Sequence, residues 1–544
     1  MRNRFFLIAC LLVAAGNICA QHNVYLNESN RTRIVNGVDS IAFGSEQATL
    51  WSGTTSCSFS VPAVSRMSLK EKDSWRTKVM PERFLADFDY DIAFANEDRE
   101  RGAAEPEVSD ETSPLYDDFA AHSTWTKTVR IAFDGNSVSV EGDTDSLSIQ
   151  KDGAHLTITT AATGVRYILS GRSGNGGLKL YSERKALVVL NGVDLTNPKG
   201  PVINSQLKRR LFLELAEGTV NTLTDGATYN KVEGEDQRGC VFAEGKLCIS
   251  GRGQLRVDGN KKCGIASDKY VHLMDGFVRI NAHAQKGKAL YGKDGVLIGG
   301  GVLQALSDGA AGKRIPEVKT EDEHEQKVEA AASPKGIKSA GNITFDSGRV
   351  YVRCSGGAAA EGIEAKKEIR VNGGKIRSYC VDDGMNAEGC YIRGGDVMVC
   401  STENDGFDVS YLYLFGGSLY TIGGDVDQMG LDTDGKTFIV NGGELVGLGA
   451  RNCQPYESSG QPSVLCYVKK HVAGLALADS EGRVIRSIPA PETYGIVCVL
   501  LSNGDIEMGG HYKILSYEHS LDDAPVTEYD FTVESMSTVL GSFR

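Results

Sequence analysis

The chain has 544 residues, and its 58 lysines and arginines against 71 aspartates and glutamates give it a formal net charge of −13 at pH 7. This acidic balance argues against nucleic acid as a partner, because affinity for phosphate is built from excess lysine and arginine. A single compact core does not need a chain of this length, whereas a solenoid of stacked repeats can be this long without dividing into domains.

The N-terminal stretch, residues 1–20, has the pattern of a signal peptide. Arg2 and Arg4 precede an apolar run over residues 5–15, and Asn17-Ile-Cys-Ala20 follows this run. The run is too short for a membrane span, and no later stretch is long and apolar enough to be one. We therefore predict cleavage after Ala20 and an exported product, secreted or held at the cell surface. Cys10 loosely resembles a lipoprotein box, but apolar sequence follows it, so lipid anchoring there is the less favoured alternative.

Residues 21–125 are polar and show no ladder of strands. They carry an acidic patch from Asp98 to Asp118, and we expect a partly ordered N-terminal region. From Thr128 onward, short alternating stretches such as residues 129–133 and 156–159 are separated by Asp-Gly and Gly-Asp turns. These stretches predict strands, and we expect a solenoid over residues 126–450.

A glycine doublet recurs through the second half of this region. The doublets are Gly373-Gly374, Gly394-Gly395, Gly416-Gly417 and Gly442-Gly443, with Ser347-Gly348 as a degenerate member. Their second positions, from Gly348 to Gly443, are 26, 21, 22 and 26 residues apart. A period in this range is typical of stacked supersecondary units.

Apolar residues alternate on both sides of each doublet, and a third apolar column follows. The third column consists of Ile265, Leu290, Ile337, Ile363, Met385, Phe407 and Leu431. Units this short cannot bury a face alone, but stacked units share a continuous internal column. Three columns predict an all-β parallel β-helix with three short strands per coil.

Two segments depart from the repeat. Residues 308–333 are rich in charges without a period, which predicts a solvated loop inserted into one coil. Residues 451–544 read as a small antiparallel β element, and capping the open end of a solenoid is a sufficient reason for it. Within this segment, Cys453 and Cys466 are either a disulfide or two free thiols.

Acidic residues form two columns beside the third apolar column, and some neighbouring residues add to them. The candidate ligands are Glu361, Glu364, Asp382, Asp383, Asp405, Asp408 and Asp432. Equivalent residues on adjacent coils lie about 4.8 Å apart, so these carboxylates repel one another and their pKa values rise unless a cation intervenes. Calcium suits such a set of hard oxygen ligands. The alternative is that Asp-Gly and Asn-Asp-Gly are ordinary turn formers on a solvated face.

Tyrosines and arginines share outward rows of the predicted strands. Tyr391 and Tyr413 lie in one row, Tyr351 and Tyr420 lie in another, and Arg370, Arg377 and Arg393 lie among them. Exposed aromatic rings with guanidinium groups suit sugar rings that carry carboxylates. The alternative is that tyrosine is simply a good strand residue on a half-exposed face.

No constellation of residues for hydrolysis is visible in the sequence. A polysaccharide lyase needs less: a calcium ion and one arginine or lysine base would suffice to abstract a proton beside a uronate carboxylate. Arg377 or Arg393 could be this base.

Several motifs together resemble the secreted bacterial carbohydrate-binding domain family. They are the Gly-Gly ladder, the Asp-Asp-Gly-Met and Asn-Asp-Gly-Phe steps at residues 382–385 and 404–407, and residues 219–225 and 333–338. The resemblance implies a right-handed parallel β-helix shaped like pectate lyases, with calcium among its coils and no established catalysis. It also implies binding of cellulose and polygalacturonate. The sequence departs from the pattern at Lys335 and Met429, where neighbouring coils have acids, and at Glu361, which replaces Asp.

The first hypothesis is therefore an exported, calcium-stabilised protein that binds plant-type polysaccharide, acidic or cellulosic. A pectate-lyase-like eliminase is the second, and a structural or adhesive surface protein is the third. The sequence leaves the oligomeric state open.

Overall fold

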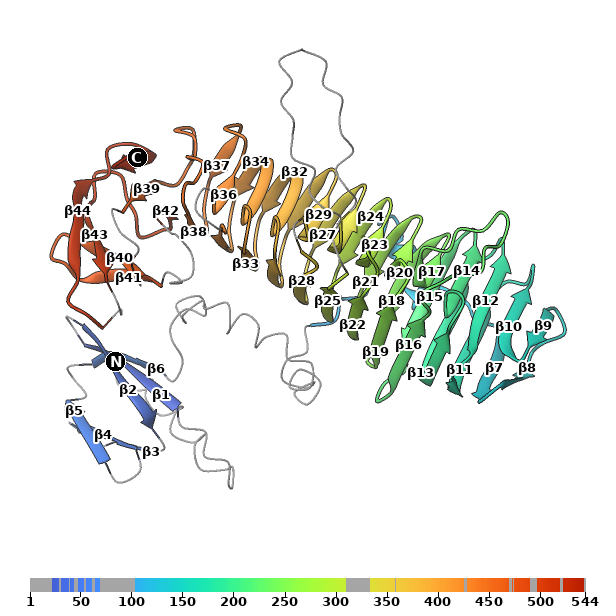
Figure 1. The fold of residues 1–544 in the computed structure, drawn as a ribbon. Coiled ribbons are helices and arrows are strands. Elements are labelled where there is room, and N and C mark those ends of the chain that lie inside the picture. Colours follow the sequence, from blue (N-terminus) through green and yellow to red (C-terminus); the bar gives the residue numbers. More distant parts are fainter. Residues whose placement is uncertain are drawn as a thin grey trace, which may run out of the picture. The chain divides into compact units, whose positions relative to one another are not determined.

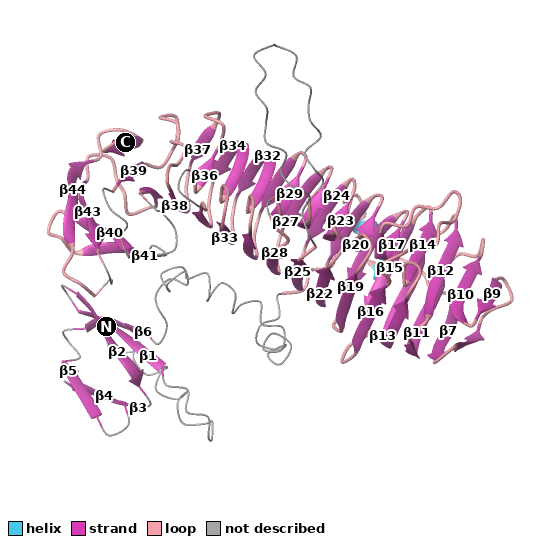
Figure 2. Ribbon diagram, in the orientation of Figure 1, coloured by secondary structure: helices cyan, strands magenta, loops and turns pink. Residues whose placement is uncertain are grey.

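The computed structural model describes strands between His22 and Ser68 and residues 103–309, 333–357, 359–424, 428–468, 472, 474–489, 497–518 and 522–542. The fold is nearly all β, with no α-helix among these residues, and is dominated by a parallel β-solenoid of about 11 turns (Figures 1 and 2). The predicted fold class is confirmed. No helix in the described part of the chain is long and apolar enough to cross a membrane.

The chain divides into two compact units. One consists of residues 1–80, 472–491 and 511–532, and the other of residues 81–471, 492–510 and 533–544. The second unit contains the β-helix. The signal-peptide prediction for residues 1–20, Cys10 within it, and most of the predicted loop at 308–333 lie outside the described residues.

Three parallel sheets form the β-helix, and each coil contributes one strand, or half of a longer strand, to each sheet. Sheet 1 contains β10 (Ala154–Thr159), β12 (Gly176–Ser182), β14 (Ile203–Leu207), β17 (Gly239–Ala243), β20 (Cys263–Ser267), β23 (Lys288–Gly292), β26 (Lys335–Ser339), β29 (Glu361–Ala365), the first halves of β32 (Met385–Ile392) and β34 (Phe407–Leu414), and β36 (Leu431–Asp432).

Sheet 2 contains β7 (Lys127–Asp134), β11 (Val165–Ser173), β13 (Ala186–Asn197), β15 (Arg210–Leu215), β18 (Lys246–Ser250), β21 (Tyr270–Leu273), β24 (Gly295–Ile298), β27 (Asn342–Phe345), β30 (Glu368–Val371), the second halves of β32 and β34, and β37 (Phe438–Val440). Sheet 3 begins with the last residues of β13 and continues through β16 (Val220–Asp225), β19 (Gln254–Gly259), β22 (Phe277–Ala282), β25 (Val302–Ser307), β28 (Arg349–Cys354), β31 (Lys375–Cys380), β33 (Asp396–Ser401), β35 (Ser418–Ile422) and β38 (Glu444–Gly449).

The first coil and the last coil are closed by antiparallel strands. At the start, β8 (Ser137–Gly142) pairs with β7 and β9 (Ser148–Asp152) pairs with β10. At the end, β42 (Cys498–Ser502) pairs with β38 and with β39 (Ser463–Tyr467), and β45 (Ser537–Leu540) lies parallel to β39. Neither Cys453 nor Cys466 forms a disulfide in the structure, which agrees with the alternative of two thiols.

The other compact unit is also antiparallel. Its C-terminal part is the sheet β41 (Val484–Pro489), β40 (Gly474–Asp479), β43 (His511–Tyr517) and β44 (Val526–Thr532). Its N-terminal part has two sheets, which sequence analysis did not predict. One is β2 (Arg31–Val38), β1 (His22–Glu28) and β6 (Val64–Ser68), and the other is β3 (Ser40–Phe43), β4 (Gln47–Ser52) and β5 (Thr55–Ser60).

The core is one continuous column inside the three sheets. The predicted third apolar column is fully inside it, from Ile265 through Met385 and Phe407 to Leu431, with each side chain at most 2% exposed. Burying one such side chain contributes about 1.5–3 kcal/mol. Equivalent apolar positions of successive coils stack in this core, which is why the alternation of apolar residues was enough to predict the fold.

Sheets 2 and 3 meet at a corner built from the glycine doublets. Gly395 has φ +85°, and a Cβ there would lie 2.8 Å from the carbonyl oxygen of Gly374 on the preceding coil. At Gly417 the corresponding distance, to the oxygen of Gly395, is 2.6 Å. Only glycine fits this left-handed turn at such close approach. Three residues separate the strands at this corner in every coil from β21 to β38, whereas the corner between sheets 3 and 1 has connections of very different length.

Residues 103–125 form an ordered segment that we call the N-terminal strap. It includes two 3-10 turns, η3 (Tyr116–Asp118) and η4 (Ala120–His122). Phe119 and Trp125 of the strap pack on outward side chains of sheet 2, among them Phe212, Cys248 and Met274. Part of the region expected to be only partly ordered is therefore a cover for the β-helix.

Candidate metal and carbohydrate site

The predicted acidic columns lie at the corner where sheet 3 leads into sheet 1. Inward residues Ile363, Met385, Phe407 and Leu431 pair in register, and the next residues, Glu364, Asn386, Asp408 and Asp432, pair with one another on the outer side. Register is fixed by the buried column, because a slip of one residue would turn these apolar side chains to solvent. The acids are therefore held side by side by the packing of the core.

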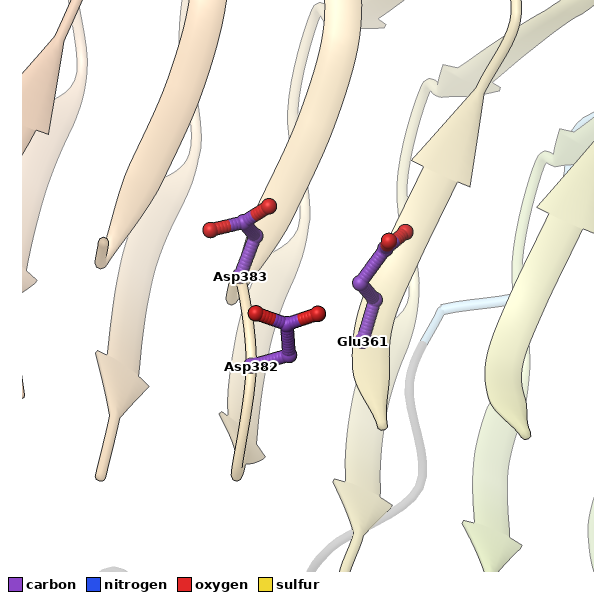
Figure 3. A group of neighbouring side chains, drawn as sticks. All are labelled: Glu361, Asp382 and Asp383. Atoms are coloured by element: carbon purple, nitrogen blue, oxygen red, sulfur yellow. The ribbon is translucent and has the colours of Figure 1, made fainter. Parts of the chain in front are cut away.

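Glu361, Asp382 and Asp383 form the first acidic group. Each offers a carboxylate oxygen, and these oxygens lie within 4.8 Å of one another. Figure 3 shows Asp382 and Asp383 on one coil and Glu361 on the neighbouring strand. The amide of Asn404 donates to Asp382 over 2.7 Å and to Asp383 over 2.6 Å.

Burial and mutual repulsion disfavour the charged form of this group. Burial raises the pKa of Asp383 well above its ordinary value, and the charges of Asp382 and Glu361 raise it further. Burial also raises the pKa of Glu361 to about 7, with further contributions from Glu364 and Asp382 against the opposing charge of Lys335. Glu361 Oε2 is buried and has no hydrogen-bond partner among the described residues. A cation between these oxygens would relieve both the repulsion and the unpaired oxygen.

Asp408, Asp432 and Asp434 form the second acidic group, again with ligand oxygens within 4.8 Å of one another. Burial, followed by repulsion from Asp432, raises the pKa of Asp408 to about 6. Burial also raises the pKa of nearby Asp405 to about 6, although the backbone N–H of Met429 donates to it. Asp434 was not among the predicted ligands. Asp434 itself has a positive φ, 52°, at the point where it joins the group.

Glu364 differs from the other predicted ligands. Its carboxylate lies 2.7 Å from Lys338, 2.5 Å from Lys366 and 3.6 Å from Lys335. Burial alone would raise the pKa of Glu364, but these three ammonium groups hold it at about 2. Glu364 is thus neutralised by lysines and is outside both acidic groups.

Aromatic side chains gather on the outer face of sheet 2, at β32 and β34. The rings of Tyr391 and Tyr413 are stacked with centroids 5.2 Å apart, and Tyr413 and Phe415 are stacked at 6.1 Å. Tyr411 meets both tyrosines edge-on. The guanidinium of Arg393 lies 5.3 Å from the Tyr391 ring centroid and 5.7 Å from that of Phe415. We call these five residues the aromatic platform.

The platform is open to solvent. Phe415 is 42% exposed, the three tyrosines are half-buried, and Arg393 is exposed without an ion pair among the described residues. Tyr411 and Phe415 were missed in the sequence, although both lie two residues from Tyr413 and so share its face of the strand.

The expected exposure of the second tyrosine row is wrong. Tyr351 and Tyr420 are each 3% exposed, so neither offers an open ring face. Both point outward from sheet 3, but the outward row there is covered, as the burial of Gln304 and Arg377 also shows. Alternation gives the direction of a side chain and not whether something lies over it.

The structure does not assemble a lyase base with the acids. Arg377 is 4% exposed, its guanidinium lies 2.5 Å from the Asp396 carboxylate, and it donates to the carbonyls of Ile376 and Asp396 over 3.0 and 2.9 Å. A guanidinium held in this way is not available to abstract a proton. Arg393 follows β32, whereas Asp383 precedes it, so the length of this strand separates them.

Part of the chain is similar to known proteins. A family model described as "Carbohydrate-binding domain-containing protein" matches residues 152–406. A curated protein of that description from Acetivibrio thermocellus is 28% identical over 164 residues, which are 29% of this chain and 55% of the relative. The chain therefore matches about half the length of that relative. The predicted resemblance to carbohydrate-binding proteins is confirmed over this region.

One solved structure is also similar. It is described as the structure of the polysaccharide lyase-like protein from C. thermocellum, gadolinium derivative. The alignment covers 58% of this chain and 93% of that one, at 18% identity and a TM-score of 0.31.

Proposed function

We propose, starting from the match of residues 152–406 to the carbohydrate-binding domain family, that this protein binds polysaccharide on the outer face of its β-helix. The observation that carries the proposal is the aromatic platform, in which three stacked, partly exposed rings and an exposed guanidinium lie together. Apolar faces of sugar rings stack on aromatic rings, and Tyr side chains lose little conformational entropy on binding.

The chemistry of the platform favours a plant-type polysaccharide. Arg393 presents a planar donor fork that suits the carboxylate of a uronic acid, and the rings suit a cellulosic chain equally well. Tyr411 is fixed by donating to Glu368 over 2.9 Å, and Glu368 is in turn paired with Arg370. The platform is therefore supported from one side and open on the other.

Calcium is the cofactor that we propose for the two acidic groups. Their carboxylate oxygens are hard ligands at the close spacing that calcium bridges. Asn386 and Asn404 also lie against these acids, and because the amide orientation is assigned from hydrogen bonding, a half-turn would present their oxygens instead. Bound calcium would supply the missing positive charge and tie adjacent coils together.

Titration of the mature protein with polygalacturonate and with soluble cellulose oligosaccharides tests this function. Binding is followed by calorimetry with calcium and then with chelator, while absorbance reports unsaturated product. We expect calcium-dependent binding without absorbance. Rising absorbance would establish the eliminase alternative, and failure to bind any glycan would leave the structural or adhesive protein.

A substitution localises the ligand. Replacing Tyr413 by Ala removes the central ring of the platform, and we expect about tenfold weaker binding, equivalent to about 1.4 kcal/mol. Tyr456, which is 42% exposed on another part of the chain, is the matched control. Equal affinity of the Tyr413→Ala and Tyr456→Ala variants would place the ligand elsewhere.

The pH dependence of stability tests the cation. Asp405 and Asp408 have pKa values raised to about 6, so the folded protein is most stable while they are protonated and loses stability as pH rises through about 6. In chelator, the melting temperature should therefore be higher at pH 5 than at pH 7.5. Calcium should raise it mainly at pH 7.5, and an equal effect at both pH values would contradict binding at these acids.

We also propose that the chain is exported, because of the pattern of residues 1–20. N-terminal sequencing of the secreted product should begin at Gln21.

A further inference from the structure

One of the two acidic columns, which together we call the acid ladder, changes from positive to negative charge along the β-helix. Lys335 pairs in register with Glu361, and the same position is Lys288 on the coil before and Asp383 and Asp405 on the coils after. The column thus reads as two lysines followed by three acids. The change occurs between adjacent coils.

Lys335 is held inside the protein. It is 4% exposed, and its ammonium lies 2.6 Å from Glu361 Oε1 and 3.6 Å from Glu364 Oε2. A buried ammonium is retained only with such partners, because isolated burial of a charge is strongly unfavourable. The ammonium of Lys335 is therefore a fixed positive charge next to the first acid of the ladder, Glu361.

Glu361 is shared between this ammonium and the first acidic group. Oε1 contacts Lys335, while Oε2 is buried without a hydrogen-bond partner in the described structure. Glu364, in contrast, has two further lysines, Lys338 and Lys366. Removal of the Lys335 charge would therefore leave Glu361, and not Glu364, without a cation.

We propose that the Lys335 ammonium is a built-in cation that competes with a metal ion for Glu361, and so sets the calcium affinity of the group formed by Glu361, Asp382 and Asp383. This inference rests on the proposed calcium binding. An ion between these three acids is one carboxylate away from the ammonium, and two cations at that separation repel each other in a partly buried site. Lys335 is thus the end of the acid ladder. Its charge keeps the calcium affinity of the group formed by Glu361, Asp382 and Asp383 low.

The test compares calcium binding to wild type, Lys335→Met, Lys335→Arg and Lys366→Met by calorimetry. Lys335→Met keeps the apolar stem and removes the charge, and we expect at least about tenfold tighter binding to one class of sites. Lys335→Arg keeps the charge and should stay close to wild type. Lys366→Met is the matched control, because Lys366 is 61% exposed and contacts Glu364 alone of these acids.

A second measurement covers the possibility that Lys335→Met folds poorly without a cation. The variant is purified in calcium and then treated with chelator. Because the ion replaces the ammonium, chelation should lower its melting temperature more than that of wild type. Calcium affinity and chelator effect equal to wild type would overturn the role of Lys335 while leaving calcium binding intact.

The remaining outcomes separate the two proposals. Wild type without calcium binding, together with a Lys335→Met variant that binds, would overturn calcium as the native cofactor and support Lys335 as the cation that excludes it. Absence of binding by both proteins would overturn calcium and this inference together. Polysaccharide binding by wild type is measured separately and does not depend on either result.

Discussion

Sheet 2 presents two different outer faces along the same β-helix. At β13, β15, β18 and β21 its outward residues are covered by the N-terminal strap, and Trp125 meets Phe212 edge-on at 5.6 Å. At β32 and β34 the outward residues form the open aromatic platform, with Tyr391 and Tyr413 nearly parallel at 8°. Outward aromatic residues alone therefore do not mark a binding face. The distinction is whether the chain supplies its own cover.

Ionic contacts reinforce this difference. His272 on the covered face lies 2.9 Å from Asp118 and also pairs with Glu105, both from the strap. Arg210 lies 2.6 Å from Asp118, and Tyr270 donates to the same carboxylate. Arg393 on the platform is exposed and forms no such ion pair within the described residues, although its charge contributes to the lowered pKa of Glu368. The covered face is a satisfied polar and apolar interface, whereas the platform leaves its cation available to a ligand.

The largest expected effect comes from removing Asp118. Asp118→Ala would leave Arg210 and His272 buried without their shared carboxylate, and we expect the strap to lose about 3–5 kcal/mol of protection against local opening. Hydrogen exchange of residues 103–125 measures this loss. The neighbouring Asp117 is exposed, and Asp117→Ala should change exchange little. Similar exchange in both variants would mean that the ion pairs do not hold the strap.

A pair of phenylalanines tests the apolar part of the comparison. Phe212 is fully buried beneath the strap, and Phe212→Ala should cost about 3 kcal/mol because the strap closes only part of the cavity. Phe415 is 42% exposed on the platform, and Phe415→Ala should cost about 1 kcal/mol or less. Urea unfolding of both variants gives the two values. Equal losses would show that the platform is as closely packed as the covered face.

The smallest expected effect is a pH dependence of the strap. Burial alone would lower the pKa of His272, but Asp118 and Glu105 raise it above its ordinary value. A raised pKa stabilises the folded state below about pH 6.5, and this contribution is lost as pH rises through the folded value. Hydrogen bonds from His272 and Tyr270, against the effect of burial, lower the pKa of Asp118, whose contribution is lost only in acid.

Proteolysis of the strap should therefore be faster at pH 9 than at pH 5.5, after correction with an unstructured substrate. Replacing His272 by Asn should flatten this difference. A steeper difference in the variant would assign the effect to other groups.

The sequence predicted the β-helix because its information is local and repeated. Alternation around each glycine doublet fixed the register, and register alone brought Asp383 beside Glu361 and Asp408 beside Asp432. The strap has no such signal, since its order comes from contacts between residues far apart, such as Asp118 and His272, 154 residues from each other. The alternation of apolar and polar residues likewise does not predict that Tyr351 and Tyr420 are covered. The pairing of Glu364 with a lysine could have been predicted from the sequence, because Lys338 is in register with it on the preceding coil.

The two corners of the β-helix differ in how freely they accept new sequence. The glycine corner always spans three residues between β21 and β38, and its third residue is a glycine in every coil, with no room for a side chain. Over the same coils, the connections from sheet 3 to sheet 1 instead range from the short one at residues 381–384 to the long one at residues 308–334, while the strands beyond them return to the same register. Insertions at this edge leave the core unchanged. The acid ladder lies on that same edge. Evolution or loop grafting can therefore change what such a scaffold binds without changing the residues that determine its fold.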